Sequence, residues 1–307
     1  MGSRRLGFWR FALDAIDCSG SVYLWVVVHD WGSAPGKTGF KLLVTKDGWT
    51  RGTIGGGVME SDLVARPWAS EPVLVRKVHL ADAAREERSG MICAGGQLMV
   101  GCVLEEDQRP VIESILDSEK QQNPKWIHLT QRGLSLRESG IQGFVNHELE
   151  WTYQEEVGCV PILYVIGAGH VGKAIAKQFQ LLDFHVVVLD DRAEMCATCE
   201  GVADEVVVAG FDEIGSVIDS EKARVAVVTR AFDTDITALK SLLNRQFGYL
   251  GLMGSHHKIA RIKQELLAAG ARRDWLDQIV APLGIPISNR TPAEIAVSLA
   301  AQLISLR

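Results

Sequence analysis

The chain has 307 residues, of which 47% are hydrophobic and 23% charged, and its formal net charge at pH 7 is −6. This composition excludes an intrinsically disordered chain and leaves room for two domains, while the acidic balance argues against a general nucleic-acid binder. No apolar run has the length of a membrane span or a signal peptide, and six scattered cysteines do not resemble a disulfide framework. We therefore expect a cytoplasmic protein that binds neither nucleic acid nor membranes.

The first half of the chain predicts a mixed domain of helices and strands. Apolar residues at three- and four-residue intervals predict an opening helix from Leu6 to Ile16. Strands are expected at residues 22–29, 40–45, 49–54, 73–78 and 97–104. Helices are expected at residues 58–65 and 108–118. Between residues 119 and 158 the pattern is weak and predicts short strands at most.

From Pro161 onward, apolar strand-like runs alternate with helical segments. The expected strands are residues 162–166, 185–189, 205–208, 224–229 and 249–253, and the expected helices are residues 171–182 and 234–244. Such alternation is typical of a parallel sheet covered on both faces. We therefore predict an α/β protein in which residues 158–307 form a Rossmann-like, doubly wound parallel sheet and residues 1–157 form a smaller α+β domain. A final helix is expected to start at Thr291, because Pro292 and Glu294 complete a capping box.

A Gly-x-Gly-x-x-Gly motif at Gly167, Gly169 and Gly172 directly follows the strand at residues 162–166. In that context glycines let the backbone approach a pyrophosphate, and the helix start offers amide donors. The motif therefore predicts a nucleotide site. The alternative is that the glycines serve only close strand–helix packing. His170 lies between the glycines and is expected either near a bound phosphate or in solvent.

Asp190, Asp191 and Arg192 end the next expected strand. An acid at this position binds a ribose hydroxyl and repels a 2′-phosphate, whereas a nearby arginine accepts that phosphate. We favour Asp190 on a ribose hydroxyl, and we expect an acid at a strand end to contribute little to packing.

Three loops of the first half are rich in glycine: Gly32 to Gly39, then Gly55, Gly56 and Gly57 with Glu60 close behind, and Cys93 to Gly96. Each by itself is more often a turn than a site. Three in one domain predict backbone crowding around a ligand.

The order of these motifs resembles that of the xanthine dehydrogenase accessory proteins of the XdhC/CoxI type. The resemblance covers roughly residues 20–105 and 160–305. It is carried by the three glycine loops, by the glycine motif at Gly167, and by two further segments, residues 248–255 and 281–296. The chain departs from the family pattern at Gly36, at Val58, and at His256 and His257, where two arginines are usual.

The resemblance implies a maturation chaperone more than a turnover enzyme. Such proteins bind the molybdenum cofactor, a molybdopterin, and assist its sulfuration and its insertion into an apo molybdenum hydroxylase. A sulfur donor and a homo-oligomer are also implied. The cofactor-binding residues implied on this chain are Gly55, Gly56, Gly57, Glu60, Cys93 and Ser255, beside those of the Gly167 loop.

The thiolate of Cys93 suits molybdenum or a transferable sulfur, since both are soft partners, and the alternative is a buried thiol that packs as an apolar group. The carboxylate of Glu60 suits the amine donors of a pterin, although capping of a helix explains it as well. Cys196 and Cys199 have a Cys-x-x-Cys spacing, for which chance is the better explanation than zinc or redox chemistry.

Two other functions remain open. The first is an NAD(P)-dependent oxidoreductase, and the second is a nucleotide-binding regulatory module. Because ligand sites favour domain interfaces, we also expect the loops around Gly57 and Cys93 to face the nucleotide crevice, so that one ligand spans both domains.

Overall fold

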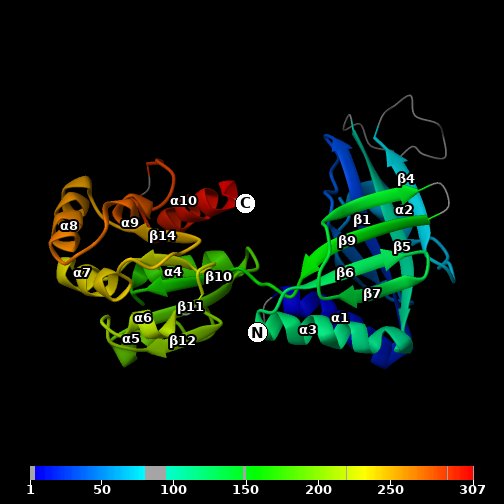
Figure 1. Cartoon of the computed structure of the whole chain (residues 1–307). Helices are drawn as coiled ribbons and strands as arrows, with labels where there is room; N and C mark the ends of the chain where they lie inside the picture. The colour runs from blue at the N-terminus through cyan, green and yellow to red at the C-terminus, as the bar shows by residue number, and fades with distance from the viewer. Residues whose placement is uncertain (1–3, 80–94, 148–149, 219, 289, 307) are drawn as a thin grey trace. The chain divides into compact units, whose positions relative to one another are not determined.

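The computed structural model describes all residues except 1–3, 80–94, 148–149, 219, 289 and 307. The chain forms two compact units (Figure 1). One consists mainly of Val160–Arg307 and the other of Arg5–Cys159.

The unit of Arg5–Cys159 contains a five-stranded antiparallel sheet in the order β3-β2-β1-β5-β4. Its strands are β1 (Ser21–Gly32), β2 (Lys41–Val44), β3 (Thr50–Gly52), β4 (Val73–Val78) and β5 (Gly95–Glu105). β1 alternates its side chains between two cores, since Val22 and Leu24 pack on one face and Tyr23 and Trp25 on the other. The first core is covered by α1 (Arg4–Ser19) and α3 (Arg109–Gln121), and the second by α2 (Gly57–Val64).

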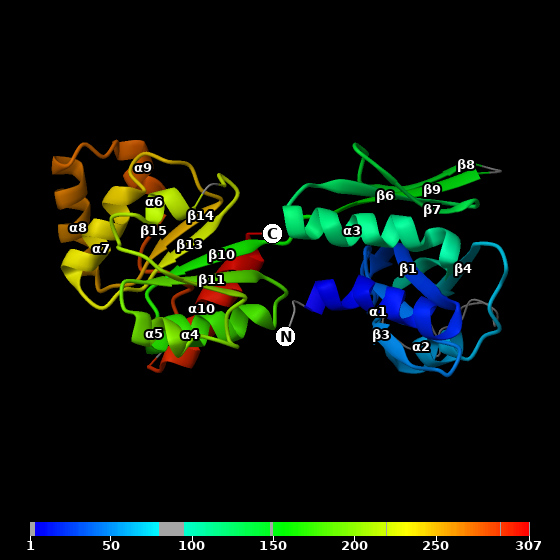
Figure 2. The ribbon, with the colours of Figure 1, turned by 90° about the horizontal axis from the view of Figure 1, so that it is seen from below.

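A second antiparallel sheet lies in the segment for which the sequence pattern was weak. Its order is β7-β6-β9-β8, and its strands are β6 (Lys125–Thr130), β7 (Gly133–Arg137), β8 (Gly143–His147) and β9 (Glu150–Val157). Ile127 and Leu129 on β6, with Trp151 and Tyr153 on β9, join the core beneath α1 and α3. A short 3-10 helix η1 (Glu106–Gln108) precedes α3, and the two views place α1 beside α3 (Figures 1 and 2).

The unit of Val160–Arg307 is built on a six-stranded parallel sheet in the order β12-β11-β10-β13-β14-β15. Its strands are β10 (Ile162–Ile166), β11 (His185–Asp190), β12 (Glu205–Val208), β13 (Arg224–Val227), β14 (Tyr249–Leu252) and β15 (Ile279–Val280). The predicted doubly wound parallel sheet is confirmed. Its strand order reverses between β10 and β13, the point at which this fold binds ligands.

Helices cover both faces of this sheet (Figure 2). They are α4 (His170–Gln180), α5 (Ala193–Ala197), α6 (Ile214–Val217), α7 (Phe232–Ser241), α8 (His256–Ala268), α9 (Arg273–Gln278) and α10 (Pro292–Ser305). Tyr164 and Ile166 of β10 face the core shared with α6 to α9, while Leu163 and Val165 face the core shared with α4 and α10. Helices α5, α6, α8 and α9 were not predicted. The capping box of α10 is confirmed, because Thr291 Oγ1 accepts from the Glu294 amide and the Glu294 carboxylate accepts from the Thr291 amide.

Candidate functional site

The three glycines of the loop after β10 differ in backbone conformation and in the space that a side chain would have. Gly167 has φ 119°, and its amide donates to the Leu189 carbonyl at 2.7 Å. A Cβ at Gly172 would lie 1.8 Å from the Gly167 carbonyl oxygen, so the start of α4 packs directly on the loop. A Cβ at Gly169 would meet nothing within 4 Å. The loop is therefore open to an approaching ligand only around Gly169, the N-cap of α4.

Asp190, at the end of β11, is wrapped by protein donors. Its Oδ2 accepts from the Ala168 amide at 2.8 Å and from Arg192 Nη2 at 3.0 Å, while its Oδ1 accepts from the Arg192 amide at 3.1 Å and Nε at 2.8 Å. The side chain is 1% exposed. The expectation that this acid contributes little to packing is wrong, because its carboxylate fastens the glycine loop to β11.

Asp191 is the more accessible acid of the pair, with a side chain 32% exposed. Its two oxygens accept from Arg230 Nη1 at 2.6 Å and Nη2 at 2.8 Å. The Arg230 guanidinium lowers the pKa of Asp191 to about 2, so this carboxylate is ionised at any physiological pH. Arg230 follows β13 and was not predicted as a site residue, since nothing in the local sequence connects it with an acid 39 residues earlier.

His170 and the two cysteines after it in the chain take different positions around the loop. His170 is exposed at the first turn of α4. The buried Cys196 and Cys199 lie under the loop, where their thiols donate to the carbonyls of Asp190 at 3.6 Å and Ala168 at 3.9 Å. Burial raises the pKa of both thiols, which keeps them protonated and unreactive.

Ser255 lies after β14, at the same edge of the sheet, and caps α8 by accepting from the Lys258 amide at 3.3 Å. The Lys258 ammonium pairs with the buried carboxylate of Asp235 on α7. Asp235 also accepts from the Thr229 hydroxyl, so one buried acid connects the segment after β13 with the first turn of α8. Desolvation raises the pKa of Asp235, against the opposite effect of Lys258.

Two glycine loops of the first unit, the one around Gly36 and the one around Gly55, meet at Gln97. This residue is fully buried on β5. Its Oε1 accepts from the Gly36 amide at 3.1 Å, and its Nε2 donates to the Ile54 carbonyl at 2.8 Å. A Cβ at Gly36 would lie 2.1 Å from the Ile54 carbonyl oxygen, and one at Gly55 would lie 2.7 Å from the Gly36 amide nitrogen. Gly36 and Gly55 are therefore crowded by atoms of the protein itself, and crowding of the loops around a ligand stays a prediction.

Glu60 closes the triple-glycine loop from the first turn of α2. Its Oε2 accepts from the Thr53 hydroxyl at 2.7 Å, the Ile54 amide at 2.8 Å and the Gly56 amide at 3.0 Å. Gly55, Gly56 and Gly57 have φ values of 125°, 71° and 67°, which only glycine adopts readily. Glu60 therefore has the helix-capping role that the sequence analysis gave as the alternative, because it accepts from the amide of Gly56, the N-cap of α2.

Cys93 lies outside the described residues. Gly95 and Gly96, expected in the same loop, are the first residues of β5 and pair with Gly32 and Trp31 on β1. A Cβ at Gly96 would lie 2.2 Å from the Trp31 ring, so this glycine makes room for an indole. The prediction that the loop extends to Gly96 is wrong.

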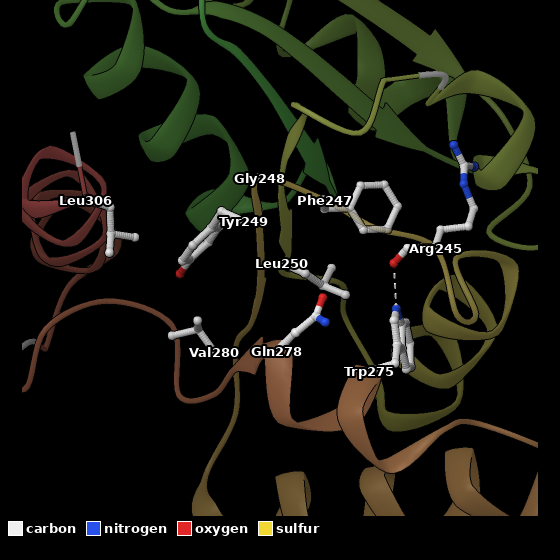
Figure 3. A pocket seen from close by; sticks show the side chains of 9 residues that line it. All are labelled: Arg245, Phe247, Gly248, Tyr249, Leu250, Trp275, Gln278, Val280 and Leu306. Carbon is white, nitrogen blue, oxygen red and sulfur yellow. Dashed lines mark hydrogen bonds between the residues drawn. The ribbon is translucent and has the colours of Figure 1, made fainter.

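A cavity of about 300 Å³ opens beside the amino end of β14 (Figure 3). Two hydrogen bonds hold aromatic residues of its wall, from Trp275 Nε1 to the Arg245 carbonyl and from the Tyr249 hydroxyl to Gln302. Its lining was not predicted and consists of Arg245, Phe247, Gly248, Tyr249, Leu250, Trp275, Gln278, Val280 and Leu306. The glycine loop, by contrast, follows the carboxyl end of β10, so the cavity is a separate feature.

Within the ranges that the structure describes, no group of three or more His, Cys, Asp or Glu side chains is arranged to hold a metal ion. Over the same residues, no helix combines the length and apolarity that crossing a membrane requires.

Two family models match the chain and together cover more than half of it. The model of the XdhC Rossmann domain matches residues 163–303, and the model of the XdhC and CoxI family matches residues 17–71. A probable xanthine dehydrogenase component of Bacillus subtilis is 24% identical over 98% of both chains. The uncharacterized protein YqeB of Escherichia coli is 27% identical over 65% of this chain, which spans only 37% of that longer protein.

The fold has a solved counterpart. The crystal structure of a xanthine dehydrogenase from Bacillus halodurans superimposes with a TM-score of 0.78 at 22% identity, over 97% of this chain and 95% of that one. At that identity the likeness shows the fold alone.

Proposed function

We propose, since the chain belongs to the XdhC and CoxI family, that it binds molybdenum cofactor and assists its sulfuration and its insertion into a xanthine dehydrogenase-like hydroxylase. Family membership indicates the coarser role of a xanthine dehydrogenase accessory protein. The observation that carries the proposal is that one family model matches in each of the two units. The client is an apo molybdenum hydroxylase in the cytoplasm, with a sulfur donor as a further partner and a homo-oligomer as the working form.

The nucleotide end of such a cofactor fits the loop of Gly167, Gly169 and Gly172. The space around Gly169 and the start of α4 suit a phosphate, because a helix start offers amide donors and a positive dipole end. His170 is exposed beside that space, and Ser255 lies at the same carboxyl edge of the sheet. NAD(P) is the other ligand that this geometry suits.

The pterin end of the cofactor is proposed to bind the first unit. Gly55, Gly56, Gly57 and Glu60 form a tight loop in which one carboxylate oxygen already receives three donors. Cys93 remains the proposed ligand of molybdenum or of a transferable sulfur. Its position facing the nucleotide site remains a prediction.

Mass spectrometry of ligands released from the purified full chain tests the proposal. Protein made in a host with molybdopterin synthesis should release molybdopterin or its nucleotide, and protein from a host without that pathway should not. The loaded protein should also restore activity to an apo-hydroxylase, whereas the Cys93→Ser variant should not. Release of no pterin from the competent host would overturn the proposal.

The same preparation separates the two other functions. Release or binding of a nicotinamide dinucleotide, followed by its oxidation or reduction with added substrates, would favour an NAD(P)-dependent oxidoreductase. Binding of a nucleotide with neither turnover nor cofactor transfer would favour a regulatory module.

A further inference from the structure

The side chain of Arg230 reaches from the end of β13 past β10 to the ends of the strands beyond it. It pairs with Asp191, which follows β11, and its guanidinium carbon lies 5.6 Å from the ring centre of Phe211, which follows β12. In the sheet order β12-β11-β10-β13, this contact passes the carboxyl end of β10, where the glycine loop begins. Arg230 therefore lies at the strand ends where this fold receives a ribose.

Asp190 is a poor candidate for that ribose. A carboxylate offers about four acceptor positions, and four protein N–H groups already point at Asp190. A ribose hydroxyl would have to displace Arg192 or the Ala168 amide, and displacing the latter would release the glycine loop.

Asp191 has the opposite character. Its bidentate contact with Arg230 uses one N–H on each oxygen, and its side chain remains 32% exposed. A carboxylate that a guanidinium binds through both of its oxygens is fixed in orientation, and it can still accept a hydrogen bond from a ligand.

The charges of this edge also matter for the choice of nucleotide. Asp190 and Asp191 are balanced by Arg192 and Arg230, whose closest contacts to these acids are 2.8 Å and 2.6 Å. A lone acid at this position repels a 2′-phosphate, and an arginine beside it accepts one. Arg230, with a side chain 41% exposed, is placed to meet such a phosphate.

We propose that Asp191, held by Arg230, receives the ribose hydroxyls of a nucleotide at the glycine loop, and that Arg230 admits a 2′-phosphate on that ribose. Asp190 is then a positioning residue for the loop. This inference rests on the proposed nucleotide site and names its ribose contacts.

Calorimetric titration of the full-length protein with NAD⁺ and NADP⁺ tests the inference, because the two probes differ only in the 2′-phosphate. Wild type should bind NADP⁺ at least as tightly as NAD⁺. Asp191→Asn keeps the shape of the side chain and should weaken NAD⁺ binding about tenfold, the scale of one charge-assisted hydrogen bond. Arg230→Gln should weaken NADP⁺ about tenfold and NAD⁺ much less. Asp212→Asn, which alters an exposed acid next to Phe211, is the matched control and should change neither affinity.

The outcomes are distinct. If wild type binds both probes and the Asp191 and Arg230 variants match it, the ribose assignment is wrong and the nucleotide site stands. A wild-type preference of more than tenfold for NAD⁺ would overturn the role of Arg230. If wild type binds neither dinucleotide, the glycine loop does not take a nicotinamide dinucleotide and the assignment of the ribose and the 2′-phosphate is wrong, whereas the molybdopterin proposal is decided separately by the mass spectrometry of released ligands.

Discussion

A Cβ atom added at Gly169 would meet no atom within 4 Å, whereas one added at Gly36 would lie 2.1 Å from the Ile54 carbonyl oxygen. The first glycine lies in the loop after β10 and the second in a loop of the antiparallel unit. Both loops look alike in sequence, since each places clustered glycines directly after an apolar strand. The structure separates them by what occupies the space that a side chain would need.

In the antiparallel unit, that space is filled by the protein itself at Gly36, Gly55 and Gly96, with Gln97 and Trp31 as neighbours, whereas a Cβ at Gly56 would meet nothing within 4 Å. In the loop after β10, Gly172 is likewise crowded, and Gly169 alone of the three is open. A glycine-rich loop is thus a site only where the missing side chains leave room for a ligand. Substitutions on the crowded and open sides test this contrast, and the largest effect is expected at Gly172.

Gly172→Ala should be the most damaging change in the loop after β10. Its Cβ would lie 1.8 Å from the Gly167 carbonyl, and neither the loop backbone nor the start of α4 gives way easily. Overpacking of this kind costs about 3 kcal/mol, and occasionally more. Urea denaturation should therefore give a much lower midpoint or an insoluble protein, while Gly169→Ala should stay within about 0.5 kcal/mol of wild type. Equal stability of the two variants would remove the distinction between crowded and open glycines.

Gln97→Leu tests the crowded side of the comparison. The substitution leaves the Gly36 amide and the Ile54 carbonyl without the amide group that connects them. Each unsatisfied buried group costs about 1–3 kcal/mol, so two groups at the lower end of that range give an expected loss of about 2 kcal/mol in unfolding free energy. The control Gln121→Leu, at an exposed position of α3, should stay within about 0.5 kcal/mol. If Gln97→Leu is as stable as wild type, Gln97 does not hold the loops together.

How far sequence predicts this molecule differs between the same two regions. The parallel sheet followed from continuous apolar runs such as Ile162–Ile166, which are typical of strands buried on both faces. The second antiparallel sheet was missed because its strands bury one face only. On β6, Ile127 and Leu129 alternate with half-buried Trp126 and His128, and such short amphipathic segments give a weak signal.

The site was predicted to the extent that it is local in sequence. Gly167, Gly169 and Gly172 form one motif, and their loop lies at the reversal point of the strand order. The roles of Asp190 and Asp191 were not accessible in the same way. They depend on Arg230, which comes 39 residues after Asp191, and on the backbone amide of Ala168, 22 residues before Asp190. Hydrogen bonds of this kind have no period or spacing that a sequence pattern reveals.

Gly169→Ala tests the open side of the comparison. Gly169 has φ −70°, a conformation that alanine adopts without strain, so the fold should be unaffected. The added methyl group would occupy the space through which a pyrophosphate approaches the loop. Nucleotide affinity measured by calorimetry should fall about tenfold, equivalent to about 1.4 kcal/mol. Unchanged affinity would mean that the ligand, if one binds, does not approach at Gly169.

The smallest expected effect concerns the pH dependence of the Asp191–Arg230 pair. Arg230 lowers the pKa of Asp191 from 3.8 to about 2, so the folded state favours the carboxylate. The pair therefore stabilises the fold at pH values above the unfolded pKa, and this contribution is lost as the pH falls toward 2. Because both side chains are about a third exposed or more, solvent screening should keep the contribution below about 1 kcal/mol. The difference in unfolding free energy between wild type and Asp191→Asn should therefore be largest near neutral pH, shrink as the pH falls from about 5 toward 2, and decrease in high salt. A difference that grows as the pH falls would mean that Asp191 is not held as an ionised partner of Arg230. The ribose assignment, which depends on an ionised and oriented Asp191, would then lose its support.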